Sequence, residues 1–394
     1  MVVGLVCFGR LEAWKDGRFR QVFQPSRYHK VCSKILTLSY FAAGTKVDYN
    51  LPTGGEVGSD ALTPPLFCGR KEQLVRALIT GITGFAGGHL AQILLDQGDE
   101  VFGVARDLGQ GLKHLSQEVR PTIADMRDPL VVTNLFSEIQ PDAIYHLAAQ
   151  AFVPTAWADP WTTLENNIRP QLNILEAMVK QKSKARLLVV ASNEIYGGVQ
   201  SNELPVKEDT PLRPNNPYGV SKVAQDILGL QYYLSHGLDV LRVRAFNHIG
   251  SRQSPFFVAA SFAKQIAEIE AGLIEPTLRV GNLNAKRDFT DVKDVAQAYA
   301  LLVRHGDSGE AYNVGTGQAH SIQSLLEILL SYANVKIKVE QDPNRMRPSD
   351  VPIIYADNSK LRAKTGWEPT YKFKESLRLV LDYWREEVKN RVAE

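Results

Sequence analysis

The sequence predicts an α/β protein in which a doubly wound parallel sheet is joined to a smaller α/β substrate domain. Three observations support this prediction. Short apolar strands alternate with amphipathic helices from Val75 onward, a glycine-rich turn separates the first strand from the first helix, and the alternation becomes irregular beyond Gly250. Strands that alternate with helices form βαβ units, and such units build a parallel sheet.

The expected elements follow each other in a regular order. Short apolar runs predict strands at residues 75–80, 100–105, 121–124, 142–147, 186–192 and 239–246. Helices are expected at about residues 88–97, 129–139, 164–182 and 216–235. Turns that follow the strands are therefore the first places to search for a site, because an open α/β sheet binds its ligands at the carboxyl ends of its strands.

The composition limits the class of protein. Hydrophobic residues make up 44% and charged residues 22% of the 394 residues, which excludes a collagen, a coiled coil and a wholly disordered chain. A formal net charge of only +2 recruits neither nucleic acid nor an anionic membrane. The apolar stretch at 35–45 has 11 residues, and a membrane-spanning helix needs about 20. We therefore expect no nucleic-acid partner and no membrane partner.

The first 72 residues differ from the rest of the chain. They hold all three cysteines, Cys7, Cys32 and Cys68, and they show no sustained periodicity. We expect a poorly ordered N-terminal extension, either a separate segment or an upstream stretch included by a misplaced start; the competing hypothesis is an extension docked on the main domain. Everything beyond Cys68 is free of thiols, which fits a reducing compartment and predicts a cytoplasmic protein.

A glycine-rich loop at residues 80–88 lies between the first strand and the first helix. Gly81, Gly84 and Gly87 have the spacing G-x-x-G-x-x-G. Glycine permits a tight turn and close approach of the backbone to a pyrophosphate, and the helix N-terminus offers free N–H groups. This context predicts a Rossmann-type dinucleotide-binding domain. The alternative is a glycine-rich turn without a ligand.

The end of the second strand distinguishes the two nicotinamide cofactors. An acidic residue there binds the adenosine ribose, whereas an arginine suits the 2′-phosphate of NADP. Ala105 stands where the acid would be and Arg106 follows it, which favours NADP(H) over NAD(H). The alternative is that Arg106 is a solvated loop residue and that Asp107 binds the ribose. Asp125, after the third strand, is placed to cap the adenine end or simply to open a turn.

Tyr218 and Lys222 form the candidate catalytic pair. They lie four residues apart on one face of the helix that follows the fifth strand. A nearby ammonium group is expected to lower the tyrosine pKa from its ordinary value of about 10. Ser192 ends the fifth strand and can donate to the same substrate oxygen. Tyr332 and Lys336 have the same spacing but lie far from any predicted strand end.

Three further residues near these turns have two interpretations each. Glu194 is either a general base or a loop carboxylate in a salt bridge. His146 and His248 could be metal ligands, but neither has companions at a suitable spacing, so we expect no metal and a structural role for both.

These motifs resemble those of the extended short-chain dehydrogenase/reductases that act on nucleotide sugars. The resemblance covers about residues 75–384 and rests on the glycine-rich loop, His-Leu-Ala-Ala-Gln at 146–150, the Ser192/Tyr218/Lys222 set and Phe-Asn-His at 246–248. Residues 246–250, 262–267, 280–283, 287–292 and 345–351 are similar to the GDP-4-dehydro-6-deoxy-D-mannose reductase family. Ser251 departs from that pattern, which usually has proline there.

The resemblance implies an NADPH-dependent reduction of the C4 ketone of GDP-4-dehydro-6-deoxy-D-mannose to GDP-D-rhamnose, with Tyr218 as proton donor, Ser192 polarising the ketone and Lys222 orienting the cofactor. It also implies a homodimer that pairs through helices 164–182 and 216–235. The NADP-binding domain would span residues 73–250, with later segments returning to it, and residues 251–394 would mainly bind the nucleotide sugar. The implied cofactor contacts are Gly81, Thr83, Gly84, Phe85, Ala86, Gly87, Arg106, Asp125, Met126, Leu147, Ala148, Ala149, Tyr218 and Lys222. The implied substrate contacts are Asn193, Asn247, Lys264, Arg287, Arg347 and Asp350.

Several alternatives stay open at this point. The GDP-mannose 4,6-dehydratases are a sister family with a Ser/Thr-x-Glu turn in which the glutamate removes the C5 proton, so Glu194 keeps dehydration as the main alternative. An epimerase and a non-catalytic NADP-binding module come next. Arg287 and Arg347 are expected to bind the diphosphate, or else to form surface ion pairs with Asp288 and Asp350.

Overall fold

The computed structural model describes residues 75–346 and 351–393. The expectations for the first 72 residues, for Arg347 and for Asp350 lie outside this range. Within it, no helix combines the length and the apolar character that crossing a membrane requires. The same residues contain no group of three or more His, Cys, Asp or Glu side chains that could hold a metal ion.

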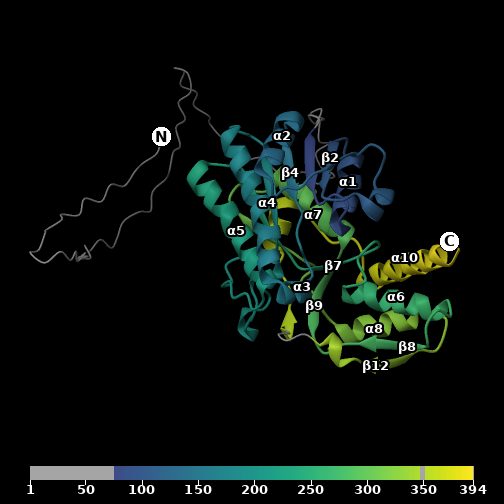
Figure 1. The fold of residues 1–394 in the computed structure, drawn as a ribbon. Coiled ribbons are helices and arrows are strands. Elements are labelled where there is room, and N and C mark those ends of the chain that lie inside the picture. The colour runs from purple at the N-terminus through teal and green to yellow at the C-terminus, as the bar shows by residue number, and fades with distance from the viewer. Residues whose placement is uncertain (1–74, 347–350, 394) are drawn as a thin grey trace, which may run out of the picture. The chain divides into compact units, whose positions relative to one another are not determined.

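A seven-stranded parallel sheet in the order β10-β6-β5-β4-β1-β2-β3 forms the larger part of the fold (Figure 1). Its strands are β1 (Arg76–Thr80), β2 (Glu100–Ala105), β3 (Arg120–Ile123), β4 (Ala143–His146), β5 (Arg186–Ser192), β6 (Val240–Ala245) and β10 (Ala311–Val314). The order reverses between β1 and β4, which is the switch point where open α/β sheets bind their ligands. The predicted doubly wound sheet is therefore confirmed.

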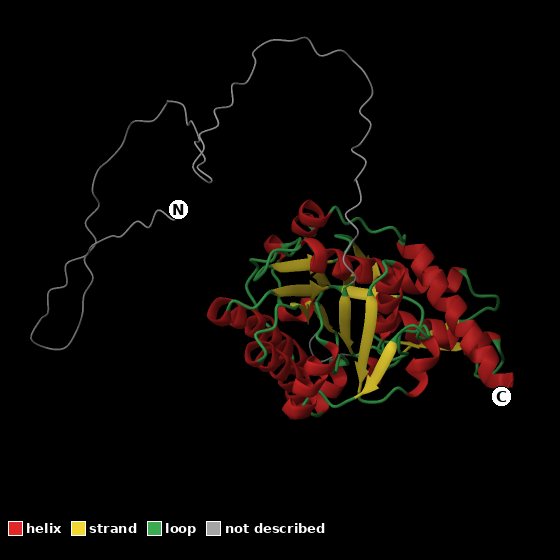
Figure 2. Ribbon diagram, turned by 90° about the horizontal axis from the view of Figure 1, so that it is seen from above, coloured by secondary structure: helices red, strands yellow, loops and turns green. Residues whose placement is uncertain are grey.

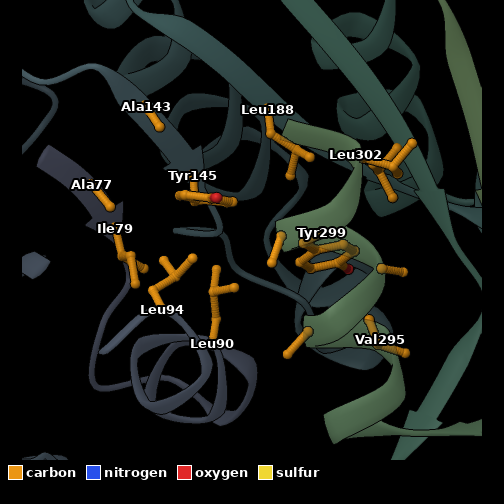
Figure 3. Close-up of a cluster of buried hydrophobic side chains, with 14 of the residues drawn as sticks. Ala77, Ile79, Leu90, Leu94, Ala143, Tyr145, Leu188, Val295, Tyr299 and Leu302 are labelled. Carbon is orange, nitrogen blue, oxygen red and sulfur yellow. The ribbon is translucent and has the colours of Figure 1, made fainter. Parts of the chain in front are cut away.

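Helices cover both faces of this sheet, and strands buried on both faces read as continuous apolar runs (Figure 2). On one face lie α1 (Phe85–Asp96), α7 (Val292–His305) and α9 (Ser359–Thr365), which share one core cluster with Ala77 and Ile79 of β1; Figure 3 shows part of this cluster. On the other lie α2 (Pro129–Ile139), α4 (Pro160–Lys180) and α5 (Pro217–His236), which share a second cluster with Leu78. The alternation of Ala77, Leu78 and Ile79 between two cores follows from the period of two along a strand.

A smaller α/β part lies beside the sheet. Its core is built mainly from α6 (Val258–Glu270), α8 (Ile322–Ser331) and α10 (Phe373–Ala393). The short strands β7 (Asn247–Ile249), β11 (Ala319–Ser321) and β13 (Ile353–Ile354) pair with β9 (Lys286–Asp291), and β12 (Lys338–Gln341) pairs with β8 (Thr277–Val280). Beyond residue 250, α7 and β10 return to the large sheet, while the proposed domain boundaries stay a prediction.

Two helices begin earlier than their sequence patterns indicated. The helix expected from residue 164 begins at Pro160, because Asp159 accepts a hydrogen bond from the Thr162 N–H and Pro160 occupies the first helical position. The helix expected from residue 88 begins at Phe85, directly after the N-cap Gly84. This second shift moves the start of α1 into the glycine-rich loop.

Candidate active site

The glycine-rich loop between β1 and α1 is packed too tightly for larger residues. Gly81 has φ +75°, and a Cβ there would lie 2.9 Å from the backbone N and Cα of Ala148. A Cβ on Gly87 would lie 2.5 Å from the carbonyl oxygen of Gly81. The N-cap residue Gly84 offers no side-chain cap, so the first N–H groups of α1 lack a side-chain acceptor there. This arrangement is a cradle for an anion such as a pyrophosphate.

The turn after β4 closes this cradle. The Leu147 N–H donates to the Thr80 carbonyl oxygen and the Ala148 N–H donates to Thr80 Oγ1, so the ends of β1 and β4 are held together. Phe85 stacks on His248 of β7 with ring centroids 5.6 Å apart. The fold thus brings a set of predicted cofactor contacts to one edge of the sheet, namely Gly81, Thr83, Gly84, Phe85, Ala86, Gly87, Leu147, Ala148 and Ala149.

Two arginines meet at the ends of β2 and β3. Arg106 Nη1 lies 3.5 Å and Arg127 Nη1 lies 3.3 Å from the same Oδ1 atom of Asn166 on α4. Arg127 also binds both carboxylate oxygens of Asp125, at 3.0 and 2.6 Å, and this contact lowers the pKa of Asp125. Asp125 is therefore already paired with an arginine that the sequence interpretation missed. The only signal for Arg127 was its position two residues after Asp125.

Asp107 and Met126 have structural contacts at this edge. Asp107 Oδ1 accepts from the Gly109 N–H at 2.9 Å, and the Asp107 carbonyl oxygen accepts from Thr83 Oγ1 at 3.3 Å. The Asp107 carboxylate thus caps a turn, which weakens the alternative that it binds the ribose. Met126 is buried in the core between the sheet and its helices.

The predicted catalytic side chains come together. Ser192 ends β5, Tyr218 lies in the first turn of α5, and Lys222 follows one turn later; their exposed fractions are 8%, 8% and 3%. Asn216 caps α5 by accepting from the Gly219 N–H at 2.8 Å. The Ser192 side chain lies close enough to Tyr218 to influence the pKa of its phenol. Both side chains therefore lie near the carboxyl end of β5.

The pKa values of this pair correct one expectation. Burial raises the pKa of Tyr218 above its ordinary value, although its hydrogen bond with Ser192 opposes the rise. Burial also lowers the pKa of Lys222 to about 7, and Lys222 Nζ donates to the Val190 carbonyl oxygen at 2.8 Å. The expectation that Lys222 lowers the tyrosine pKa is therefore wrong, because burial dominates both groups. A phenol that keeps its proton at neutral pH is the form that can donate it.

Glu194 and Asn193 complete the turn after β5. Glu194 Oε2 accepts from Asn216 Nδ2 at 2.7 Å, and the charge of Glu194 contributes to the raised pKa of Tyr218. Asn193 Oδ1 accepts from Ser192 Oγ at 3.3 Å. Glu194 thus bonds to the helix cap near Tyr218, which leaves both interpretations of its role open.

The predicted substrate contacts are spread over the smaller part of the fold. Asn247 Oδ1 is buried and has no hydrogen-bond partner among the described residues. Lys264 on α6 lies 3.8 Å from Glu268, and Arg287 on β9 donates to the carbonyl oxygen of Val351 at 2.6 Å. Both carboxylate oxygens of Asp288 accept hydrogen bonds from backbone N–H groups, namely those of residues 316, 317 and 356.

The two histidines have structural contacts. His146 Nδ1 is 2.8 Å from Thr80 Oγ1 at the switch point, and burial lowers the pKa of His146 to about 3. His248 Nδ1 lies 3.2 Å from the Phe246 carbonyl oxygen, and its ring stacks on Phe85. Both imidazoles therefore pack at the carboxyl edge of the sheet.

The matching family model and two relatives of similar sequence are named for enzymes that act on GDP-sugars. The chain matches the family model described as GDP-mannose 4,6 dehydratase over residues 78–380. It is 37% identical over 316 residues to the GDP-6-deoxy-D-mannose reductase of Pseudomonas aeruginosa, an alignment that covers 80% of this chain and 98% of that protein. It is 30% identical over 336 residues to the GDP-mannose 4,6-dehydratase of Yersinia enterocolitica, covering 75% and 89%.

Solved structures show the same fold. RMD from Pseudomonas aeruginosa complexed with NADPH has a TM-score of 0.68 at 35% identity, covering 79% of this chain and 99% of that one. The UDP-glucose 4-epimerase of Thermus thermophilus in complex with NAD has a TM-score of 0.71 at 33% identity, covering 78% and 98%. Both neighbours are therefore similar over nearly their whole length.

Proposed function

Because this chain belongs to the GDP-mannose 4,6-dehydratase family, within the extended short-chain dehydrogenase/reductases, we propose that it is an NADPH-dependent nucleotide-sugar reductase. The reaction is reduction of the C4 ketone of GDP-4-dehydro-6-deoxy-D-mannose to GDP-D-rhamnose. The observation that carries this proposal is that Ser192, Tyr218 and Lys222 are buried together at the carboxyl edge of the sheet, where burial raises the pKa of Tyr218. Similarity to a reductase at 37% identity supports it.

The residues present fit the cofactor. The backbone packs closely at Gly81 and Gly87, which would let a diphosphate approach the start of α1, and Arg106 follows the end of β2, where a 2′-phosphate is expected. When bound, NADPH supplies the hydride that C4 of the sugar accepts. Lys222, whose burial holds its pKa near 7, would gain a partner in the nicotinamide ribose hydroxyls.

The protein residues supply the proton and the placement. Tyr218 donates its phenolic proton to the C4 oxygen as the hydride arrives, so ketone, hydride and proton balance as a secondary alcohol. Ser192 donates a hydrogen bond to the same oxygen and stabilises its developing charge. The substrate contacts that we propose are Asn193, Asn247, Lys264, Arg287, Arg347 and Asp350. Among these, Asn247 offers a buried amide oxygen that a hydroxyl of the sugar could satisfy.

Dehydration of GDP-mannose is the second candidate. Glu194 lies in the turn with Ser192, and its charge affects the pKa of Tyr218, so it is a candidate base beside the proposed proton donor. Dehydratases in the comparison are about 30% identical or less, against 37% for the reductase. The lower identity makes dehydration the second choice.

One absorbance assay with three conditions separates these activities. NADPH loss that occurs only with the preformed keto sugar supports the reductase. Formation of a keto sugar from GDP-mannose supports the dehydratase, and the proposed reduction would then be wrong. Binding of NADPH without either reaction, and without epimer formation, would point to a non-catalytic binding module.

We also propose a homodimer that pairs through α4 and α5. Ile227 and Leu234 on α5 are 44% and 72% exposed, and with Leu230 they line a shallow groove of about 310 Å³. Trp161 at the start of α4 is 73% exposed. Light scattering should give twice the chain mass, and Leu234→Glu should give monomers; a wild-type monomer would contradict the pairing.

A further inference from the structure

The proposed catalytic groups lie on two separate segments. Ser192 ends β5, whereas Tyr218 and Lys222 lie on α5, and more than twenty residues of chain separate them. Two hydroxyls can act on one substrate oxygen only if both segments are held in one position. The contacts that fix α5 against the turn after β5 therefore bear directly on the reaction.

One buried arginine contacts both segments. Arg244 of β6 donates from Nε and Nη2 to the two carboxylate oxygens of Asp226, at 3.1 and 3.0 Å, and Asp226 lies one turn beyond Lys222 on α5. Arg244 Nη1 donates to the Tyr196 hydroxyl at 3.1 Å. Tyr196 ends the turn that begins at Ser192, so this guanidinium joins the helix of the proton donor to the turn of its partner.

The Tyr196 hydroxyl has both of its hydrogen-bonding roles assigned. It accepts from Arg244 and donates to Asn313 Oδ1 on β10 at 2.7 Å. Asn313 Nδ2 in turn donates to the Val206 carbonyl oxygen at 2.9 Å. Burial raises the pKa of Tyr196 to about 12, so the phenol keeps the proton that this arrangement needs. The hydrogen bonds therefore run in one direction, from Arg244 to the Tyr196 hydroxyl and from that hydroxyl to Asn313.

The network is dry. Asp226 and Asn313 are fully buried, Tyr196 is also fully buried, and Arg244 is 4% exposed. In such surroundings water cannot replace a lost partner, and a shifted helix or turn would leave charged or polar atoms unpaired. The network consequently resists small displacements more strongly than apolar packing alone.

We propose that Arg244 and Tyr196 are positioning residues that set the placement of Tyr218 and Lys222 relative to Ser192. They touch neither substrate nor cofactor and act through α5 and the turn after β5. The inference rests on the proposed use of Tyr218 and Ser192 in proton transfer. It adds Arg244 and Tyr196 to the residues on which the rate of that reaction depends.

The chain offers a matched control in Arg242. This arginine lies on the same strand and donates to the same Asp226 at 2.8 Å, but its other donors go to the Gly309 carbonyl oxygen. None of these contacts of Arg242 reaches Tyr196. Arg242→Met therefore removes a buried cation from Asp226 without cutting the connection to the turn.

The experiment compares Tyr196→Phe, Arg244→Met and Arg242→Met in the full-length chain. A misplacement of about 1 Å can cost roughly 10²-fold in rate, so we expect kcat to fall about 10-fold in Tyr196→Phe and about 10²-fold in Arg244→Met. The Kd for NADPH should change much less than kcat, because the glycine-rich loop is not part of the network and Tyr218 and Lys222 are the only proposed cofactor contacts that the network positions. Both Arg→Met variants should lower the melting temperature, but Arg242→Met should keep the wild-type kcat.

The split between KM and kcat is a readout that loss of stability alone would not produce, because a misplaced proton donor lowers kcat while the substrate contacts stay in place. Tyr196→Phe removes one oxygen and keeps the ring, so it reports even if Arg244→Met fails to fold. Wild-type kcat in Tyr196→Phe, or equal losses of kcat in the two Arg→Met variants, would overturn the proposal.

The wild-type reaction is measured first, so the two proposals fail separately. If the wild type reduces the keto sugar and the variants match it, the positioning role is wrong and the function stands. If the wild type dehydrates GDP-mannose instead, the proposed function is wrong, and the same comparison on keto-sugar formation decides the positioning role. A wild type without either reaction would overturn both.

Discussion

Replacing Gly81 by alanine tests whether the glycine-rich loop holds the cofactor. The left-handed backbone of Gly81 costs a residue with a Cβ about 1–2 kcal/mol. The new Cβ would lie 2.9 Å from the Ala148 backbone, and a forced backbone shift costs about 1–3 kcal/mol more. Together we expect Gly81→Ala to destabilise the protein by about 2–5 kcal/mol. Displaced N–H donors should also weaken NADPH binding by about 10–100-fold, since a hydrogen bond to a charged group is worth about 1.5–3 kcal/mol.

Gly98→Ala separates backbone strain from the clash. Gly98 has φ +85°, but a Cβ there would meet nothing within 4 Å. This variant should lose only the strain, about 1–2 kcal/mol, and should bind NADPH like the wild type. Thermal melts give the stability difference and fluorescence titration gives the Kd. If Gly81→Ala melts with Gly98→Ala and keeps the wild-type Kd, the cradle assigned to this loop is wrong.

Three further predictions concern side chains of the site. Tyr218→Phe should lower kcat by at least about 10²-fold, since general acid catalysis contributes about 10²–10⁴-fold, while Tyr332→Phe, at the end of α8, should leave turnover unchanged; near-normal turnover of the first variant would contradict the proton-donor role. Arg106→Ala should abolish a preference for NADPH over NADH of roughly 10–100-fold in kcat/KM, and a wild type that prefers NADH would show that the arginine is not a cofactor contact. Burial lowers the pKa of Lys222 from 10.5 to about 7, so the unfolded chain binds more protons between these values and cofactor-free stability should rise with pH there. Lys222→Met should therefore raise the cofactor-free melting temperature at pH 7 with a gain that disappears near pH 10, and an equal gain at both pH values would refute the burial argument.

Local sequence patterns predicted most of the large sheet. The bounds of β2, α2 and β5 agree with the expectation residue for residue. The two strands were visible because a strand buried on both faces is a continuous apolar run. The glycine spacing and the Tyr218–Lys222 spacing were also visible, because each depends on a few neighbouring residues. The starts of α1 and α4 were misplaced, because helix caps at Gly84 and Asp159 add a first turn without an apolar pattern.

By itself, the sequence determined the class of the fold, the place of the glycine-rich loop and the short motifs that hold Ser192, Tyr218 and Lys222, the set that we propose for proton transfer, since each is written in a short segment of the chain. Only the tertiary structure decided what surrounds these groups. Arg127 pairs with Asp125 beside Arg106, burial outweighs the expected effect of Lys222 on Tyr218, and Arg244 joins α5 to the turn after β5. Desolvation and contacts between residues distant in the chain depend on how strands and helices are packed, and no local pattern of residue types records that packing.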